Sequence, residues 1–192
     1  KRLFDIGFSV LVFLFVLWWF IPLIALIIKL TSKGPVFFIQ ERSGIKNKSF
    51  RVIKFRTMYI NSDAHYKQAT RDDQRITPIG KLLRRTNLDE MPQFINVLLG
   101  QMSVIGPRPH MLKHTEEYSK IIDKFMVRHL VKPGITGWAQ VNGYRGETKD
   151  VNDMEGRVRA DVWYIENWSF GLDVKIIVMT IINMIRGEEN AF

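Results

Sequence analysis

The hydrophobic and polar positions divide the chain into a strongly apolar first segment and a mixed remainder. Residues 8–28 read FSVLVFLFVLWWFIPLIALII, 21 positions without a charge. As a helix this run would be about 31 Å long, which matches the hydrocarbon core of a bilayer. A secretory signal would have a shorter apolar run and small residues at a cleavage site. The pattern therefore predicts a membrane-inserted helix over residues 1–30, followed by a basic domain over residues 31–192.

Two features bear on whether this helix crosses the membrane. Pro22 removes one backbone hydrogen bond, and its ring crowds the carbonyl four residues earlier, which commonly bends a helix. Basic residues stand on both sides of the run, whereas a crossing segment usually carries its positive charges on the cytoplasmic side. These residues are Lys1, Arg2, Lys29 and Lys33. The sequence is compatible with a re-entrant helix that bends near Pro22 and equally with a straight span that tolerates the proline.

The remainder of the chain begins with the pattern of a β-hairpin. Residues 35–42 and 50–58 are rich in β-branched and aromatic side chains, and a polar loop with Gly44 and Asn47 separates them. Such runs around a glycine-containing loop are typical of paired antiparallel strands. Residues 61–75 are polar and charged, which predicts a surface loop or a short helix.

Three further segments have helical patterns. Thr77 followed by Pro78 is a helix-start signal and predicts a short basic helix to residue 86. Asn87 and Glu90 resemble a capping box, which predicts a second helix ending at Gly100. Residues 172–185 carry apolar side chains at helical spacing and could pack on the core or lie in a membrane interface. These segments together predict an α+β fold, mostly helical with a small hairpin.

Composition narrows the classes of function. The 28 Lys and Arg against 19 Asp and Glu give a net charge of +9, which calls for an anionic partner. The absence of cysteine excludes disulfides, zinc-thiolate sites and thiol nucleophiles. A hydrophobic share of 46% over 192 residues is typical of a globular domain rather than a disordered chain.

Asp89 and Glu90 are adjacent acids that follow a basic cluster of Lys81, Arg84 and Arg85. On their own, two acids at a helix start are most often caps that interact with the helix dipole. The basic cluster favours a second interpretation, because cations keep a carboxylate ionised and also gather phosphate oxygens. An ionised carboxylate can attack phosphorus, and its neighbour would suit magnesium, the usual partner of diphosphates.

Two loops add candidate phosphate contacts. Residues 106–109 read GPRP, so a proline on each side of Arg108 restricts the backbone. The guanidinium is therefore held on a rigid segment and loses less entropy when it binds a phosphate. A rigid turn with an exposed arginine is the simpler interpretation. Residues 132–146, KPGITGWAQVNGYRG, hold four glycines that can bring backbone amides to an anion. Their spacing does not match a Walker A or dinucleotide-binding motif.

The remaining candidates are weaker. His110 and His114 stand four residues apart, but no HExxH motif or evident third ligand accompanies them, so a metal site there is not favoured. Lys54 and Arg56 are two residues apart on the second predicted strand and point to one side. A solvated face is the simplest interpretation of that pair.

Five ordered motifs, with the apolar segment before them, resemble the bacterial sugar transferase family, the monotopic phosphoglycosyl transferases. The motifs are KFRTM (54–58), LRRTNLDEMPQFINVLLGQMS (83–103), IGPRP (105–109), KPGITGWAQVNG (132–143) and DVWYIENWS (161–169). Residues 143–148, GYRGET, and the last motif are similar to the undecaprenyl-phosphate glucose or galactose phosphotransferases, which start exopolysaccharide, capsule or O-antigen synthesis. Those members usually carry further N-terminal membrane helices, so the chain is expected to be the catalytic portion.

The resemblance implies transfer of a hexose-1-phosphate from a UDP-sugar to undecaprenyl phosphate, with release of UMP and with Mg²⁺ as cofactor. It implies a re-entrant helix and a location on the cytosolic face of the bacterial inner membrane. It implies no nucleic-acid partner and is compatible with a homo-oligomer. Glucose or galactose is the favoured sugar.

The resemblance also implies roles for individual residues. Asp89 matches the nucleophile that forms a covalent phospho-sugar intermediate, and Glu90 matches the neighbour that holds magnesium. Asp161 is implied as a further metal contact. Substrate binding is implied for four basic residues, Lys54, Arg84, Arg108 and Arg145.

One departure from the family concerns the membrane helix, where Ile21 stands in place of the serine that often precedes the proline. This removes one hydrogen-bonding route to a bend and leaves Pro22 itself. The alternative function is a non-catalytic, membrane-anchored adaptor or nucleic-acid binder that uses the same positive charge. That alternative does not explain the presence of Asp89, Glu90 and the Pro-Arg-Pro motif.

Overall fold

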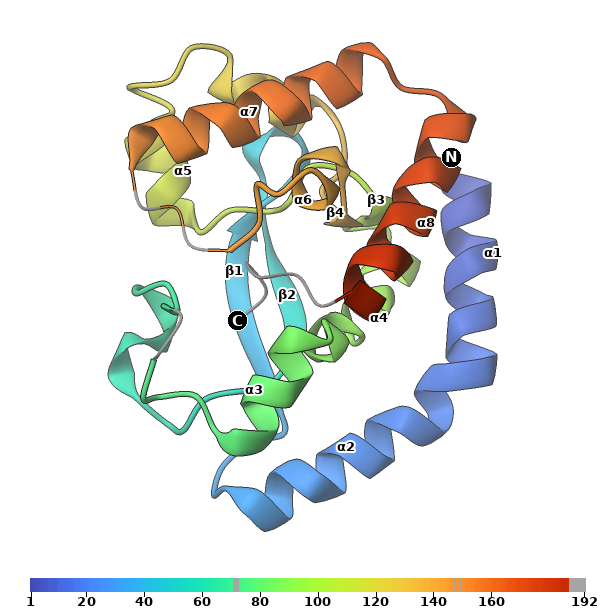
Figure 1. Ribbon diagram of the computed structural model, residues 1–192, viewed down its shortest axis with the longest axis vertical. Helices are drawn as coiled ribbons and strands as arrows, with labels where there is room; N and C mark the ends of the chain where they lie inside the picture. The colour runs from blue at the N-terminus through green and yellow to red at the C-terminus, as the bar shows by residue number, and fades with distance from the viewer. Residues whose placement is uncertain (71–72, 147, 149, 187–192) are drawn as a thin grey trace.

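The computed structural model describes residues 1–70, 73–146, 148 and 150–186 of the chain (Figure 1). Its helices are α1 (Arg2–Val12), α2 (Trp18–Thr31), α3 (Pro78–Arg85), α4 (Gln93–Leu98), α5 (Leu112–Tyr118), α6 (Trp138–Val141), α7 (Val151–Glu166) and α8 (Phe170–Arg186). Its strands are β1 (Phe37–Ser43), β2 (Ser49–Phe55), β3 (Ser103–Ile105) and β4 (Gly134–Thr136). Helices around two small two-stranded sheets confirm the predicted α+β class.

The N-terminal segment forms one long bent helix, made of α1 and α2, along the outside of the domain (Figure 1). In the part of the chain that the structure describes, this is the helix that is long and apolar enough to cross a membrane. A π-helical segment, Phe13–Leu17, joins α1 to α2. Pro22 follows within α2, and its ring disturbs the carbonyl of Trp18, directly after the π-helical turn. The bend was expected near Pro22, and the π-helical segment lies at Phe13–Leu17, a few residues before that proline.

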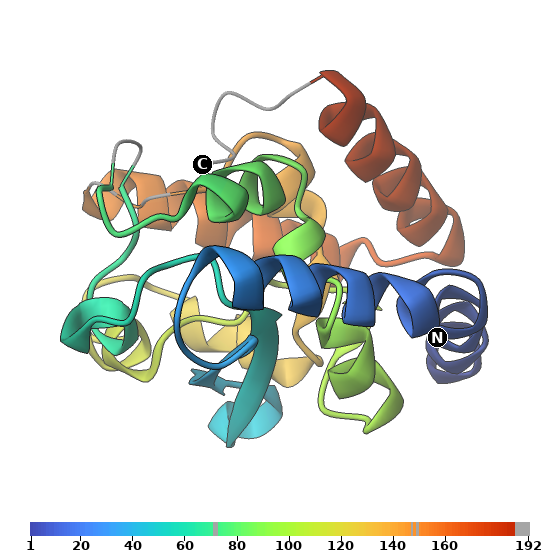
Figure 2. The ribbon, with the colours of Figure 1, turned by 90° about the horizontal axis from the view of Figure 1, so that it is seen from below.

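The two sides of this helix differ. The side that faces the domain buries Ile24 and Ile28 against Phe55 and Leu83. Leu17 is buried in a separate cluster with residues such as Val52 and Phe94. The outer side exposes large apolar groups, among them Leu14, Phe15, Trp18, Leu26 and Leu30. Figure 2 shows α2 running across the lower side of the domain toward the hairpin. An apolar outer surface of this kind is what contact with lipid requires.

Polar contacts tie the start of the helix to the domain. Lys1 Nζ donates to the Asp173 carboxylate over 2.6 Å. The Asp5 carboxylate accepts bonds from the Ser103 hydroxyl and the Val104 amide at 2.9 and 3.0 Å. Asp5 and Asp173 are both buried, so these contacts are protected from water and fix the first turn of α1.

A second set of contacts ties the end of the helix to the same domain. The Arg56 guanidinium donates to the carbonyls of Ser32, Lys33 and Pro35, at 3.0, 2.6 and 2.6 Å. The solvated position expected for Arg56 is therefore wrong, because backbone carbonyls left over at the end of α2 are its acceptors. Both ends of the long helix are held by one domain.

The hairpin matches the prediction. β1 and β2 are antiparallel, and their register sets Phe38 opposite Lys54 and Arg42 opposite Phe50. Opposite residues share a face of a two-stranded sheet, so Gln40, Arg42 and Lys54 lie on one face. The second sheet, a parallel pairing of β3 with β4, was not predicted. Strands of three residues carry too few positions for an alternating pattern to show.

Helix α3 has the predicted start, since the Thr77 hydroxyl accepts a bond from the Gly80 amide at 3.0 Å. Gly80 also permits a close approach, because a Cβ atom there would stand 2.0 Å from the Thr57 carbonyl oxygen. The predicted capping box at Asn87 is wrong. Asn87 has a left-handed backbone, with φ of 59°, and makes no side-chain cap. The next helix, α4, begins after Pro92, which suits a first turn because it lacks an N–H.

Helix α8 confirms the predicted C-terminal helix, and its two faces have different surroundings. Ile176 and Asp173 are buried against the domain, whereas Val178, Ile181 and Ile185 are exposed on the opposite side. One face therefore belongs to the core, and the other is an apolar surface of the kind that suits a membrane interface.

Candidate active site

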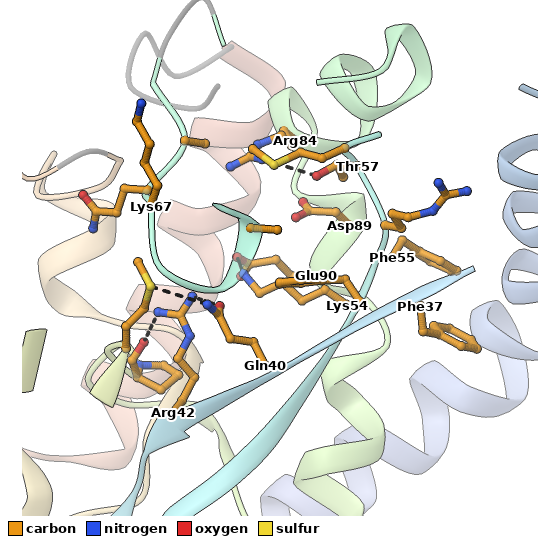
Figure 3. A pocket seen from close by; sticks show the side chains of 18 of the residues that line it. Phe37, Gln40, Arg42, Lys54, Phe55, Thr57, Lys67, Arg84, Asp89 and Glu90 are labelled. Carbon is orange, nitrogen blue, oxygen red and sulfur yellow. Dashed lines mark hydrogen bonds and ion pairs between the residues drawn. The ribbon is translucent and has the colours of Figure 1, made fainter. Parts of the chain in front are cut away.

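A cavity of about 370 Å³ lies between the hairpin, the turn after α3 and the loop after β3. Figure 3 shows the side chains that converge on it. Six of the seven predicted site residues line this cavity, and they are Lys54, Arg84, Asp89, Glu90, Arg108 and Arg145. Asp161 is not among the lining residues. The cavity thus gathers groups that are up to 91 positions apart in sequence, Lys54 and Arg145.

The adjacent acids reach the cavity through a short turn. Leu88–Glu90 forms a single 3₁₀ turn between α3 and α4. The left-handed residue Asn87 starts this turn, and asparagine tolerates that conformation better than most residues do. Asp89 and Glu90 are only 8% and 5% exposed. The turn therefore places two carboxylates in a site largely shielded from water, where charge interactions are strong.

Glu90 is held by two cations. Its Oε1 accepts from Lys54 Nζ at 2.7 Å and from Arg108 Nη2 at 2.6 Å, and its Oε2 accepts from Arg108 Nη1 at 3.1 Å. Burial alone would raise the pKa of Glu90, but Arg108 and Lys54 hold it well below its usual value. The ionised form of Glu90 is therefore favoured, and Arg108 binds its carboxylate in a bidentate manner.

Asp89 differs from its neighbour. Across the described parts of the chain, no hydrogen bond or ion pair involves its carboxylate. Burial, and next the charge of Glu90, raise the pKa of Asp89 above its usual value, and Lys54 and Arg84 oppose this. Once deprotonated, a carboxylate of raised pKa is a better nucleophile than an ordinary one. Asp89 is thus the member of the pair that lacks a contacting cation among the described residues.

The cations around Asp89 are themselves affected by burial. Burial lowers the pKa of Lys54 to about 8, although Glu90 opposes the shift. Burial also lowers the pKa of Arg84, whose Nη1 donates to the Thr57 hydroxyl at 3.3 Å. In Figure 3, Arg84, Thr57 and Asp89 lie together at one side of the cavity. Crowded cations of this kind suit a polyanionic ligand.

Asp161 lies behind the loop that carries Arg108. Arg128 Nη2 donates to the Asp161 carboxylate at 2.5 Å and to the Arg108 carbonyl at 3.1 Å. The structure therefore does not bring Asp161 together with Glu90 in the cavity. It gives Asp161 a supporting position, in which its ion pair with Arg128 braces the segment that presents Arg108.

The next feature is whether the side chains of the cavity could hold a metal ion. Among the described residues there is no cluster of three or more His, Asp or Glu side chains placed to hold an ion alone. His110 and His114 have ring centroids 6.5 Å apart, and His110 contacts Arg128. Mg²⁺ needs only one or two carboxylates when phosphates and waters supply the other ligands. Asp89 and Glu90 fit that limited role, in which an ion would share Glu90 with Lys54 and Arg108.

Opposite ends of the cavity differ in character. Phe37 and Phe55 stack with ring centroids 5.7 Å apart on the side next to α2, to the right in Figure 3. On the other side of Glu90 and Lys54 lie Gln40 and Arg42. The aromatic end fits an apolar chain, whereas the other end fits a polar or charged group.

Arg42 and Arg157 also line the cavity and were not predicted from the sequence, and His110, considered there only as a disfavoured metal ligand, lines it too. Arg42 and Gln40 are two positions apart on β1, and the register puts them on the face of Lys54. The alternation along the strand was a usable signal for Arg42. Arg157 is a buried residue of α7, and no pattern in its segment indicated a cavity.

Comparison with known proteins places this geometry in a family. The family model described as bacterial sugar transferase matches residues 1–187. The chain is 54% identical over 159 residues to the UDP-glucose:undecaprenyl-phosphate glucose-1-phosphate transferase of Escherichia coli, covering 82% of this chain and 34% of that protein. It is 45% identical to the UDP-N-acetylgalactosamine-undecaprenyl-phosphate N-acetylgalactosaminephosphotransferase of Aeromonas hydrophila, covering 85% of this chain and 38% of that protein.

A shorter relative matches along almost its full length. The exopolysaccharide production protein PSS of Rhizobium leguminosarum is 43% identical over 194 residues, covering 98% of this chain and 96% of that protein. The chain thus spans about a third of the length of the E. coli relative and nearly all of the Rhizobium one. The family match extends over the long apolar helix, the hairpin and the acid pair alike. The chain belongs to the bacterial sugar transferase family.

Proposed function

We propose that this chain transfers a hexose-1-phosphate from a UDP-sugar to undecaprenyl phosphate, giving a polyprenyl-diphosphate sugar and UMP. The observation that carries the proposal is the contrast within the acid pair, where Glu90 is clamped by Lys54 and Arg108 while Asp89 has no such partner. A buried carboxylate without a partner, surrounded by cations, suits attack on a phosphate group. The relatives from E. coli and Aeromonas hydrophila are named for sugar-phosphate transfer to undecaprenyl phosphate.

The reaction has two balanced steps. In the first, an Asp89 oxygen attacks the phosphorus that bears the sugar, and the bond to the second phosphate breaks, so that UMP leaves with the electron pair. In the second, a phosphate oxygen of the lipid attacks the same phosphorus, and the Asp89 carboxylate leaves. A covalent aspartyl phospho-sugar separates the steps. Arg84 and Arg108 bind phosphate oxygens, and Arg145 lies at the same cavity.

Magnesium is proposed as the cofactor. When bound, it would neutralise charge on the diphosphate and orient it. Glu90 would hold it, with the neighbouring Asp89 available as a second oxygen donor. Lys54 would keep Glu90 ionised, since its ammonium stands 2.7 Å from Oε1.

The position of the membrane follows from the long helix. Lys1 and Asp5 hold its start to the domain, and Arg56 holds its end. A helix with both ends on one domain enters and leaves the membrane on the same face, so we propose the re-entrant topology. The stacked Phe37 and Phe55 beside α2 would then receive the first part of the lipid chain. The proposed location is the cytosolic face of the bacterial inner membrane, with the domain boundary near residue 30.

The sugar and the pathway are proposed from the relatives. The E. coli relative is named for glucose and the Rhizobium relative for exopolysaccharide production. We therefore favour glucose, with galactose as the second candidate, in the first step of exopolysaccharide, capsule or O-antigen synthesis. A homo-oligomer stays a prediction.

The test mixes the protein in detergent with Mg²⁺ and a panel of UDP-sugars and measures UMP with and without undecaprenyl phosphate. We expect up to one UMP per site without lipid, continuous release with lipid, and the highest rate with UDP-glucose. UMP release from none of the sugars would support the non-catalytic adaptor instead. Strictly sequential kinetics, with no adduct in the absence of lipid, would keep the transferase and reassign Asp89 as a base or metal ligand.

A further inference from the structure

The arginines that line the cavity differ in what their charged ends contact. Arg108 is paired with Glu90. Arg56 donates to three backbone carbonyls, as described for the end of α2. Arg157 donates to the carbonyls of Tyr144 and Gly146. Arg108 is thus neutralised by a carboxylate, and the other two serve as braces for the chain.

Arg42 has neither role. Its Nη2 donates to the neutral Gln40 Oε1 at 2.5 Å, and its Nη1 reaches the Pro109 carbonyl only at 3.4 Å. Within the described residues no carboxylate lies within ion-pair distance of it. Burial and the nearby Arg108 lower the pKa of Arg42 to about 9, although the charge of Glu90 opposes the shift. A shielded guanidinium beside another cation is costly unless an anion joins them.

The place of Arg42 relative to Asp89 identifies that anion. Figure 3 shows Arg42 on the far side of Glu90 and Lys54 from Asp89. In phosphoryl transfer the attacking and leaving oxygens lie roughly in line, on opposite sides of phosphorus. When Asp89 attacks, the UMP phosphate leaves on the side away from Asp89. When Asp89 is itself the leaving group, the lipid phosphate must approach from that same side.

We propose that Arg42 forms a phosphate subsite that is used twice, first by the phosphate of the departing UMP and then by the phosphate of the incoming polyprenyl lipid. This inference rests on the proposed function. The shared chemistry is a terminal phosphate carried by either molecule. Gln40 holds the guanidinium in position through its Oε1. The two ligands reach the subsite in turn, the nucleotide leaving before the lipid phosphate binds.

The experiment separates the two half-reactions in Arg42→Ala, Arg42→Lys and a control, Arg51→Ala. Arg51 lies on the neighbouring strand with its side chain 77% exposed, so its loss removes a positive charge outside the cavity. The first measurement is UMP release from UDP-glucose without lipid. The second is the decay of preformed, UMP-free adduct on addition of undecaprenyl phosphate. Thermal unfolding midpoints confirm that each variant is folded.

We expect Arg42→Ala to slow both half-reactions by similar factors, about 10- to 100-fold, since charge-assisted bonds to phosphate are among the strong ones. Arg42→Lys should recover part of each rate, because it keeps the charge and loses the planar fork. Arg51→Ala should match the wild type. UMP and undecaprenyl phosphate should also compete in steady-state inhibition.

Several outcomes would overturn the shared subsite. Loss in only one half-reaction, or wild-type rates for Arg42→Ala in both, contradicts it. If the wild type releases no UMP at all, the proposed function fails instead. Calorimetric titration of UMP into the wild type and into Arg42→Ala then tests the phosphate contact of Arg42 without any turnover. Equal Kd values would exclude the contact, and binding weakened about tenfold or more in the variant would support it.

Discussion

The cavity and the interior of the domain both contain buried carboxylates, and these differ in what they contact. Asp161 and Asp173 are each 1% exposed, and they pair with Arg128 and Lys1. Asp89 is nearly as shielded, at 8%, yet no donor contacts its carboxylate within the residues described. Burial of an ionised group is costly unless it is paired. Burial alone thus does not separate Asp89 from Asp161 and Asp173, and among the described residues it is the missing donor beside the cavity that sets Asp89 apart.

The largest effect is expected for Asp89, the carboxylate in the cavity. Asp89→Asn should reduce turnover to background, because an amide has nearly the same shape but is no anionic nucleophile. Its thermal midpoint should stay within a few degrees of the wild type, since no contact of the carboxylate is lost. Turnover is followed by UMP release. Asp123→Asn, the same change at an exposed position, serves as the control. Near wild-type turnover in the Asp89 variant would remove the proposed nucleophile.

The second prediction tests the interior side. Asp161→Asn should destabilise the protein by about 3–5 kcal/mol, because it leaves the Arg128 guanidinium buried without a counter-charge. Denaturant unfolding in detergent measures this, with Asp123→Asn again as control. Activity per folded molecule should fall less than in Asp89→Asn, through looser support of Arg108. A variant with wild-type stability but no turnover would place Asp161 in the reaction itself.

The third prediction concerns the dependence of the rate on pH and the part that Lys54 has in it. Lys54 must be charged to hold Glu90, and its lowered pKa of about 8 means that it loses its proton above that pH. The rate should therefore fall above about pH 8. It should also fall on the acid side, as Asp89 with its raised pKa becomes protonated. Lys54→Arg should move the basic limb upward, since arginine stays charged. An unchanged basic limb in that variant would assign it to another group.

The smallest effect is expected for the long apolar helix of α1 and α2, whose first turn is held by two interior carboxylates, Asp5 and Asp173. The chain has no cysteine, so single cysteines at Gly7 and Lys33 give unique labels before and after the apolar run. A side chain at position 7 meets no atom within 4 Å. Both should react with a membrane-impermeant reagent from the cytosolic side. Pro22→Ala should shift a minor fraction toward spanning, because it restores the missing donor. Labelling from opposite sides in the unaltered helix would establish a span.

Local patterns predicted the elements that depend on nearby residues. The hairpin follows from two β-rich runs around a glycine-containing loop, and α3 follows from Thr77 and Pro78. The capping box at Asn87 failed because the same side chain that can cap a helix also tolerates a left-handed backbone. Local sequence leaves that choice open.

Contacts between distant segments were beyond such patterns. Lys54 meets Glu90 across 36 positions, and Arg128 meets Asp161 across 33. The family resemblance brought Lys54 and Asp161 into the site but could not say that one faces the cavity and the other braces it. The acceptors of Arg56 are backbone carbonyls, which leave no trace in a pattern of side chains. These distinctions need the register of the strands and the path of the chain.

The contact between Lys1 and Asp173 spans 172 positions, and this separation sets an order of events during synthesis. The start of α1 leaves the ribosome long before α8, which carries the residue that pairs with Lys1. Until α8 has been made, Lys1 lacks this ion pair, whereas the contacts of Arg2 and Asp5 with residues 97–104 can already form. A nascent chain stopped before α8 should therefore hold the first turn of α1 less firmly than the completed chain does.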